Sequence, residues 1–325
     1  MKNAKPLLVL LAKLLVSAGL LAFFFSRIEL DRFWETLASA NLSYIALALI
    51  VYLMTQFASA GRWCVLARPL GFKTAYKMLT SYYLIGMFFN LFAPSTVGGD
   101  VSRIYYLARE GARHDESEGG GSTIHAAVSV FMDRAVGMIV MIWLGAIGLM
   151  ISAQYAVPQP IRLLTLALAL GFVIGGLLIP VLRRVLPADG HPLLVNLRVV
   201  LRSYRDSWRV IPVAIIISFA VHLIQAWIHL ILGRAIQIEI PYSYCIIVYP
   251  LVGTFSALPI SLNGLGLREG GYLFLLGVIG IGSEQSIAFG FLLFMIVAAD
   301  SLIGGLVFLL KKAPRPGVVI AQSKL

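Results

Sequence analysis

Long apolar runs alternate with short polar segments along the whole chain. A membrane-spanning helix needs about 20 apolar residues, because each residue adds about 1.5 Å across a hydrocarbon core about 30 Å thick. The runs that are long enough are 7–26, 43–61, 123–152, 161–182, 210–232 and 285–310. The pattern therefore predicts an all-α polytopic membrane protein with about six full spans.

Two other apolar stretches are broken by proline and glycine, and their halves are too short to cross a bilayer. One break reads Pro94–Arg103 and the other Pro259–Arg268, and each runs from a proline to an arginine nine residues later. The helices expected beside the breaks are 78–93 and 100–110, then 243–258 and 265–281. Interrupted segments at matching positions in two halves of a membrane protein point to a transporter's substrate site.

The basic residues between the spans indicate how these stretches enter the membrane. They form three clusters: Arg62, Arg68, Lys73 and Lys77; Arg183, Arg184, Arg198, Arg202, Arg205 and Arg209; and Lys311, Lys312, Arg315 and Lys324. The positive-inside rule places all three clusters in the cytoplasm, together with both termini. This holds only if 78–110 and 243–281 are re-entrant hairpins that dip into the membrane from opposite faces.

The spans before the two hairpins then run in opposite directions, so a span plus a hairpin occurs twice in inverted orientation. We expect a first repeat at 43–111 and a second at 210–281, within one integral membrane domain that covers 1–325. Chance similarity between two Gly/Pro breaks is the alternative. Residues 191–209 place leucines on one helical face and arginines on another, which predicts an amphipathic helix on the cytoplasmic leaflet.

The composition agrees with a membrane protein. The 325 residues are 59% hydrophobic and 13% charged, and the mean hydropathy is +0.89. Soluble domains carry about 25% charged residues, so little of this chain is left for one. The net charge of +11 comes from segments between spans and does not indicate nucleic-acid binding. Cys64 and Cys245 have no CxxC or metal-ligand spacing, and we expect buried structural thiols.

Arg103 and Arg268 are the main candidates for substrate binding, because an arginine deep in a membrane costs about 2.5–3.5 kcal/mol. Each follows a glycine-containing break, where free N–H groups at a helix start and a planar guanidinium suit a phosphate. The alternative is structural, with Arg103 paired to Asp100, and Arg268 to Glu269 or another nearby acid. The candidates at the breaks are Gly98, Gly99, Asp100, Arg103, Asn263, Gly264, Gly266, Arg268 and Glu269.

Three further charged candidates lie inside predicted spans. Asp133 and Arg134 may be read from their position as lining a vestibule, and Asp133 equally as neutralising an arginine of the first hairpin. An intramembrane carboxylate such as Asp300 is a functional hypothesis by default. It is either a proton-coupling acid or the fixed partner of Arg268, and we favour the partner role.

Other polar residues need no catalytic explanation. His222, Gln225 and His229 form a stripe on one helical face, which interhelical hydrogen bonds explain. The chain carries no hydrolase, P-loop or zinc-protease motif, and its histidines share no ligand spacing. We therefore predict no catalytic residue, no metal, no cofactor and no enzymatic activity.

Three motifs carry a family resemblance. Asn90–Arg103 contains P-S-x-x-G-G-D-x-x-R, Asp133–Gly137 reads D-R-x-x-G, and Leu258–Glu269 reads L-P-I-S-x-N-G-L-G-x-R-E. In this order they resemble the signatures of the lysylphosphatidylglycerol synthase transmembrane, or flippase-like, family. The resemblance covers nearly the whole chain and implies lipid handling in a membrane. The aminoacyl-transferring domain of the related multiple peptide resistance factor has no counterpart here, so lysyl transfer is not expected.

The leading hypothesis is a plasma-membrane lipid translocase whose hairpins hold a phosphate-bearing head group. The expected partner is an anionic membrane lipid or a polyprenyl-phosphate-linked lipid, and no nucleic acid. Two alternatives stay open. One is an integral-membrane enzyme that modifies a lipid-linked sugar, with Asp100, Asp133 or Asp300 as a base. The other is a non-catalytic partner of a glycosyltransferase or lipid-synthesis enzyme.

Overall fold

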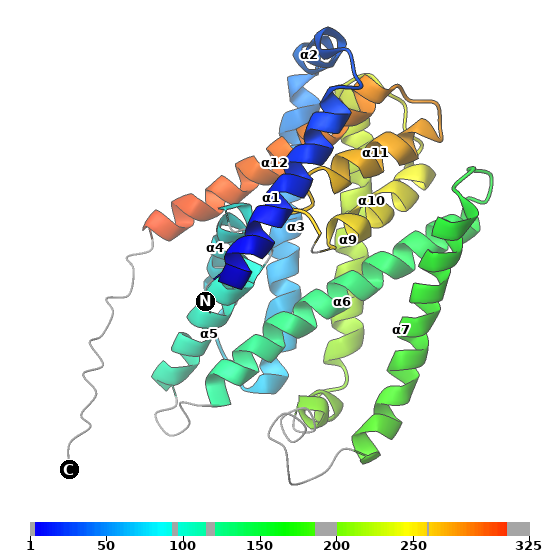
Figure 1. The fold of residues 1–325 in the computed structure, drawn as a ribbon. Helices are drawn as coiled ribbons and strands as arrows, with labels where there is room; N and C mark the ends of the chain where they lie inside the picture. The colour runs from blue at the N-terminus through cyan, green and yellow to red at the C-terminus, as the bar shows by residue number, and fades with distance from the viewer. Residues whose placement is uncertain (1–3, 93–96, 115–120, 186–199, 259, 311–325) are drawn as a thin grey trace.

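The computed structural model describes residues 4–92, 97–114, 121–185, 200–258 and 260–310, and within these ranges it contains helices and no strands (Figure 1). The helices are α1 (Ala4–Phe25), α2 (Leu30–Ala38), α3 (Leu42–Ala67), the 3₁₀ turn η1 (Arg68–Leu70), α4 (Tyr76–Phe92), α5 (Val97–His114), α6 (Gly121–Ile151), α7 (Gln159–Val185), α9 (Val210–Ala235), α10 (Tyr242–Ser256), α11 (Leu267–Gly277) and α12 (Ser283–Leu310). Five of them, α3, α6, α7, α9 and α12, are long and apolar enough to span a membrane.

These five helices coincide with five of the six predicted spans. The remaining predicted span, 7–26, corresponds to α1, which is followed after a bend of 92° by α2. α1 and α2 meet the length and hydropathy requirement of a span only when they are taken together. The prediction of an all-α polytopic membrane protein is therefore confirmed.

The predicted broken stretches are two pairs of short helices. α4 has 17 residues and packs on α5, and α10 has 15 residues and packs on α11. All four helices fall short of the roughly 20 residues that a span needs. The helices break where the sequence predicts, while the entry of each pair from one face of the membrane stays a prediction, as does the inverted repeat.

The two long helices that precede these pairs, α3 and α9, pack against each other through the middle of the bundle (Figure 1). Polar contacts tie them together along their length. The backbone N–H of Asn41 donates to the carbonyl of Ala235 at 2.8 Å, and Gln225 Nε2 donates to Thr55 Oγ1 at 2.9 Å. The two predicted repeats thus meet along their long helices.

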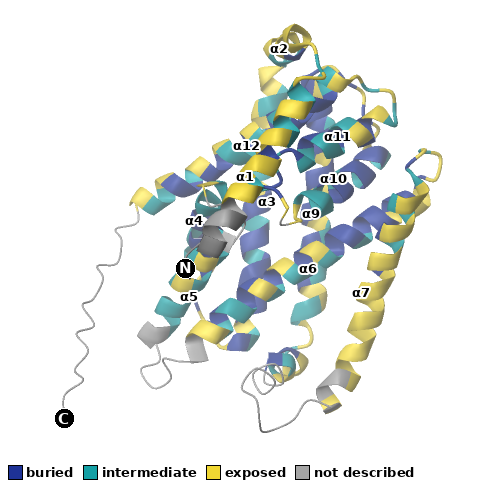
Figure 2. Ribbon diagram, viewed as in Figure 1, coloured by how far each residue is buried: buried dark blue, intermediate teal, exposed yellow. Residues whose placement is uncertain are grey.

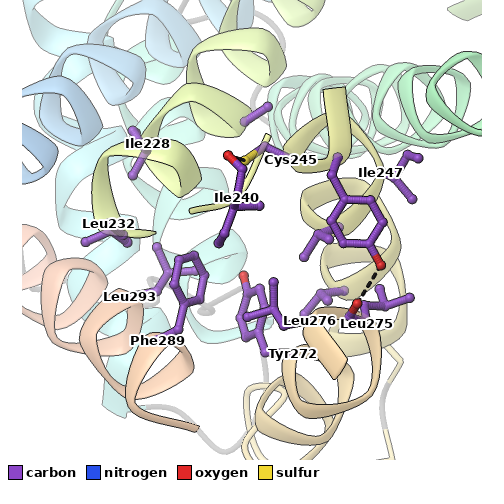
Figure 3. Packing of buried hydrophobic residues seen from close by; sticks show 14 of the residues in the cluster. Ile228, Leu232, Ile240, Cys245, Ile247, Tyr272, Leu275, Leu276, Phe289 and Leu293 are labelled. Carbon is purple, nitrogen blue, oxygen red and sulfur yellow. Dashed lines mark hydrogen bonds between the residues drawn. The ribbon is translucent and has the colours of Figure 1, made fainter. Parts of the chain in front are cut away.

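The apolar core forms two large clusters, one around each pair of short helices. One gathers residues of α9, α10, α11 and α12, where Tyr244 Oη also donates to the Leu275 carbonyl at 2.5 Å (Figure 3). The other gathers residues of α3 to α6, with Trp63, Leu79 and Leu107 at its centre. α7 stays outside both clusters, packs on α6 and exposes most of its surface (Figure 2).

The predicted amphipathic helix 191–209 lies partly outside the described residues, which resume at Val200. Residues 200–206 are helical, and Tyr204 is buried with its hydroxyl donating to the Leu66 carbonyl at 2.8 Å. Burial raises the pKa of Tyr204, so the hydroxyl remains a neutral donor. Arg202, Arg205 and Arg209 are exposed. This segment therefore docks on the bundle through Tyr204 and leaves its arginines accessible.

Close packing of α12 on α4 depends on Gly304, where an added Cβ would collide with the Leu84 carbonyl. We expect Gly304→Ala to destabilise the protein by about 1–3 kcal/mol, because the backbone of α4 has to move. The matched control is Gly175→Ala in α7, where a Cβ meets nothing within 4 Å. It should be neutral or stabilising by about 0.5–1 kcal/mol through helix propensity. Thermal unfolding in detergent measures both, and equal midpoints would contradict the tight contact.

Candidate functional site

Asp133 joins two arginines inside the bundle. Its Oδ1 lies 2.8 Å from Arg62 Nε, and its Oδ2 lies 2.7 Å from Arg103 Nη2. The three side chains come from α6, α3 and α5, and all three are buried. Buried charges are tolerated when they are paired and hydrogen-bonded, as these are. Of the two hypotheses for Asp133, the one that it neutralises an arginine of the first broken pair is confirmed.

The assignment of Arg62 to a polar segment after 43–61 is wrong. α3 continues to Ala67, and Arg62 lies within it, 6% exposed, with Nη1 donating to Ser218 Oγ of α9 at 3.0 Å. A charge ends an apolar run in a hydropathy pattern, but a charge that is neutralised by another helix can lie inside the protein. The first basic cluster therefore reduces to Arg68, Lys73 and Lys77.

Two aromatic rings hold Arg103 from either side. The guanidinium carbon lies 4.2 Å from the centre of the Trp63 ring and 4.5 Å from that of Tyr83, within cation–π range. The Trp63 indole N–H donates to Ser129 Oγ at 3.1 Å, which fixes the ring. Arg103 lies 3.9 Å from Asp100, so Asp133 rather than Asp100 is its main partner. The predicted Arg103–Asp100 lock is in this respect wrong.

The start of α5 is already filled by groups of the protein. The N–H of Gly99 donates to Asn90 Oδ1 at 2.8 Å, and Gly98 and Asp100 lie in the first helical turn. A Cβ on Gly99 would collide with the Gly86 carbonyl of α4. The close approach that Gly99 permits is therefore one between two helices, where the sequence predicts one with a head group.

Asp100 also forms an ion pair with Arg134 of α6, whose side chain is 40% exposed. Together with the Asp133 pairs, three arginines face two aspartates, which leaves a formal excess of one positive charge. These groups line a first cavity of about 260 Å³. Its lining residues are Arg62, Tyr83, Gly86, Met87, Asn90, Arg103, Asp133, Arg134, Gly137, Met138, Met141 and His222. Guanidinium groups in a cavity with net positive charge suit an anionic group.

At the second break, Arg268 and Glu269 pair with each other. Arg268 Nη2 lies 2.6 Å from Glu269 Oε1, and Glu269 Oε2 accepts the N–H of Gly266 at 2.7 Å. Gly264 and Gly266 have φ of +76° and +83°, a left-handed conformation that glycine adopts without strain. The structural alternative for Arg268 is confirmed in its choice of partner, and whether Arg268 also binds substrate stays a prediction.

Arg268 lines a second cavity of about 200 Å³. The cavity is more aromatic than the first, and its lining residues are Tyr52, Gln225, His229, Tyr249, Val252, Gly253, Ser256, Arg268, Tyr272, Leu293 and Val297. Each pair of short helices therefore contributes an arginine to a polar cavity of its own. Because Arg268 carries its own counter-ion, the second cavity has less excess positive charge than the first.

The two cavities share a wall. His222 of the first cavity has Nδ1 2.7 Å from Tyr249 Oη of the second, and its Nε2 lies 2.9 Å from the Gly137 carbonyl. Since a carbonyl only accepts, Nε2 carries the proton and Nδ1 accepts from Tyr249. Met141 of the first cavity packs against Gly253 of the second, where a Cβ would lie 3.0 Å from the sulfur. One layer of side chains thus separates the cavities.

The two breaks also touch. Asn263, with a φ of +50°, donates from Nδ2 to the Asn90 carbonyl at the end of α4 at 2.7 Å. Asn90 lines the first cavity, so a residue of the second break contacts the wall of the first. The expectation that the two broken pairs meet inside the protein is confirmed by this contact.

Asp300 is not the partner of Arg268, and the role we favoured for it is wrong. Asp300 is 0% exposed, and in the described part of the chain neither carboxylate oxygen has a hydrogen-bond partner. Arg268 pairs with Glu269 instead. The two side chains lie on different helices, and one sequence gives no way to see that an adjacent acid already satisfies the arginine.

The polar stripe of α9 is explained as predicted. His222 bonds Tyr249, Gln225 bonds Thr55, and His229 Nε2 lies 2.7 Å from Tyr272 Oη. Cys64 and Cys245 are buried free thiols, as expected. Among the described residues, no group of three His, Cys, Asp or Glu side chains is placed to hold a metal ion.

Several site residues escaped the sequence analysis. Trp63, Tyr83, Tyr52 and Tyr249 line or support the cavities, but aromatic residues are too common in apolar helices to be singled out. Arg62 had a usable signal, because a carboxylate such as Asp133 inside a span requires a positive partner.

The fold and the buried charge network define a polytopic helical membrane protein, and comparison with known proteins places it more narrowly. The family model described as the lysylphosphatidylglycerol synthase TM region matches residues 10–304, and the chain belongs to this family. A UPF0104 membrane protein, MJ1595, of Methanocaldococcus jannaschii is 28% identical over 109 residues. That alignment spans 33% of this chain and 31% of the relative, about a third of the relative's length.

Asp133 is expected to be the most sensitive of the charged residues. Asp133→Asn leaves two buried guanidinium groups without a carboxylate and should cost about 3–5 kcal/mol of unfolding free energy. The matched control is Asp206→Asn, because Asp206 pairs with exposed arginines and its side chain is 55% exposed. It should stay within about 0.5 kcal/mol of wild type. Denaturant unfolding in mixed micelles compares the variants, and an unaffected Asp133→Asn would contradict the role given to this pair.

Proposed function

We propose that the protein is a lipid translocase, which moves an anionic, phosphate-bearing lipid between the two leaflets of the plasma membrane. The observation that carries this proposal is the presence of two polar cavities, each with an arginine of a broken helix pair, on either side of one layer of side chains. A head group that crosses a bilayer needs polar surroundings at depth, and these cavities supply them.

The first cavity supports a phosphate-bearing head group. Its excess positive charge and the flat guanidinium of Arg103, stacked between Trp63 and Tyr83, favour bidentate contacts with an anion. Asp133 holds Arg103 in position while leaving the cluster net positive. We take phosphatidylglycerol and polyprenyl phosphate as the two substrate classes that share this chemistry.

An apolar groove supports the placement of the lipid tails. It has a volume of about 460 Å³ and lies between α6, α7 and α9. Its lining residues are Trp143, Ala146, Ile147, Met150, Leu166, Ala169, Leu170, Val173 and Phe219. Along α6 the groove begins two residues after Met141 of the first cavity, and on α9 Phe219 lies one turn before His222. Tails in the groove can accompany a head group in the first cavity.

The division of the core into two clusters supports a rocking motion. Each cluster packs around one pair of short helices, and α3 and α9 lie between the pairs. Movement of one cluster against the other would open the layer of His222, Tyr249 and Met141 and join the cavities. No covalent change to the lipid is part of this proposal. Both termini are proposed to lie in the cytoplasm, on the strength of the basic clusters.

Replacing the cavity arginines by lysine tests the proposal without removing charge. Arg103→Lys and Arg268→Lys keep a cation beside Asp133 and Glu269 but lose the planar, bidentate group. Loss of one charge-assisted contact worth about 1.5–3 kcal/mol predicts leaflet exchange that is slower by about 10- to 100-fold. The assay uses proteoliposomes with fluorescent phosphatidylglycerol, phosphatidylethanolamine or polyprenyl phosphate, and chemical quenching of the outer leaflet.

The matched control is Arg32→Lys, an exposed arginine paired with Glu29, which should exchange lipid at the wild-type rate. Exchange of phosphatidylglycerol or of polyprenyl phosphate alone identifies the source of the phosphate. Wild-type rates in both cavity variants, with folded protein, would refute the site. A wild-type protein that exchanges none of the three lipids would refute translocation of these head groups, and a covalently altered lipid would favour the enzyme hypothesis.

A further inference from the structure

Asp300 poses a problem that the proposed site does not solve. It lies in the dry interior of the bundle, 0% exposed, and within the described residues its two carboxylate oxygens have no hydrogen-bond partner. An ionised carboxylate without hydrogen bonds or a counter-ion is so unfavourable in an apolar interior that the group takes up a proton instead. Asp300 therefore carries a proton in this conformation.

The helices packed on α12 offer Asp300 no counter-charge. α3 contributes Tyr52, which lies within electrostatic reach of both Asp300 and Arg268. Arg268 of α11 touches α12 at Phe294 and is already paired with Glu269. The remaining contacts are His229 of α9 on Phe289, Glu29 before α2 on Glu284, Phe33 of α2 beside Ile287 and Ala288, and Leu84 and Phe88 of α4 on Gly304 and Gly305.

The position of Asp300 along α12 places it between a cavity and a sealed contact. Val297, one turn earlier, lines the second cavity, as does Tyr52. Gly304, one turn later, packs so closely on α4 that a Cβ would collide with the Leu84 carbonyl. α4 in turn carries Gly86, which lines the first cavity. Asp300 is thus within one helical turn of the second cavity and of the contact that leads to the first.

We propose that Asp300 is a proton-binding site that couples lipid exchange to proton movement. With a proton, Asp300 can stay in the dry contact and α12 closes on α4. When the second cavity widens toward it, Asp300 meets water and releases the proton, and the ionised group cannot return to the dry contact until it is reprotonated. Each cycle then exchanges one proton, which enters and leaves through the second cavity beside Tyr52. The coupling rests on the proposed translocase function, whereas the proton site stands without it.

The donor set favours a proton over a metal cation. Sodium or calcium takes several oxygen ligands, and Ca²⁺ takes six to eight. In the described part of the chain, no cluster of three acidic, histidine or cysteine side chains is placed to hold a metal ion. A single carboxyl group with two unused oxygens is enough for a proton.

The proton site is tested first without any transport, by reaction with dicyclohexylcarbodiimide in detergent. This apolar reagent attacks protonated carboxyl groups in apolar surroundings: the carboxyl oxygen bonds to the carbodiimide carbon and its proton passes to the nitrogen. Mass spectrometry of peptides should find Asp300 labelled, with labelling that falls as the pH rises. The ion-paired Asp133 and Glu269 should stay unlabelled, as should the Asp300→Asn variant. Absence of labelling on Asp300 at every pH would overturn the proton site.

Coupling is tested in proteoliposomes with a pH gradient and fluorescent phosphatidylglycerol or polyprenyl phosphate. One proton per lipid predicts a leaflet ratio that shifts by about tenfold per pH unit of gradient. Asp300→Asn mimics the protonated form and should lose this shift, and the matched control Glu284→Gln, on the same helix, should keep it. A shift that persists in Asp300→Asn, or wild-type exchange that ignores the gradient, would overturn the coupling.

The outcomes separate the two proposals. If Asp300 is labelled in a pH-dependent manner but no lipid is exchanged, the proton site stands and the translocase function falls. If lipid is exchanged, Asp300 is unlabelled and the gradient has no effect, the translocase function stands and the proton site falls.

Discussion

The ion pairs of Asp133 with Arg62 and Arg103 are the constraint on which the other features of the site depend. Three helices that are distant in sequence, α3, α5 and α6, must meet at one point, because none of the three charges is tolerated alone in an apolar interior. This point fixes Arg103 between Trp63 and Tyr83 and so defines the first cavity. A bundle of apolar helices could otherwise slide into many packings of similar energy, since apolar contacts are not directional.

Close packing of α4 on both of its neighbours supplies the second constraint. Gly99 of α5 brings that helix against Gly86, and Gly304 of α12 brings α12 against Leu84. Small residues at such crossings let backbones approach and compensate, in a membrane, for the weak apolar drive between helices. α4 is therefore positioned by glycine contacts on two sides, and any movement of α12 near Asp300 is transmitted to a helix that lines the first cavity.

The two cavities are alike in origin and unlike in chemistry. Both take an arginine from the helix after a break, but Arg103 is paired across helices, whereas Arg268 is paired with its neighbour Glu269. The first cavity keeps an excess positive charge, and the second is lined by tyrosines and lies one turn from a buried carboxyl group. Two similar sequence motifs have thus become two different environments, which is a reason for a substrate to favour one cavity before transfer and the other after it.

The sequence by itself determined the helices, their approximate ends and the two breaks, because the length and hydropathy of a run and the effects of proline and glycine are local properties. It also identified Asp133, Arg103, Arg268 and Asp300 as charges that needed an explanation. Only the tertiary structure decided their partners. Asp133 meets Arg62 and Arg103 across 71 and 30 residues, while Asp300 meets no counter-charge within the described residues. The free energy of a buried charge depends on the groups that surround it in space, and spacing along the chain does not encode which helices will bring them there.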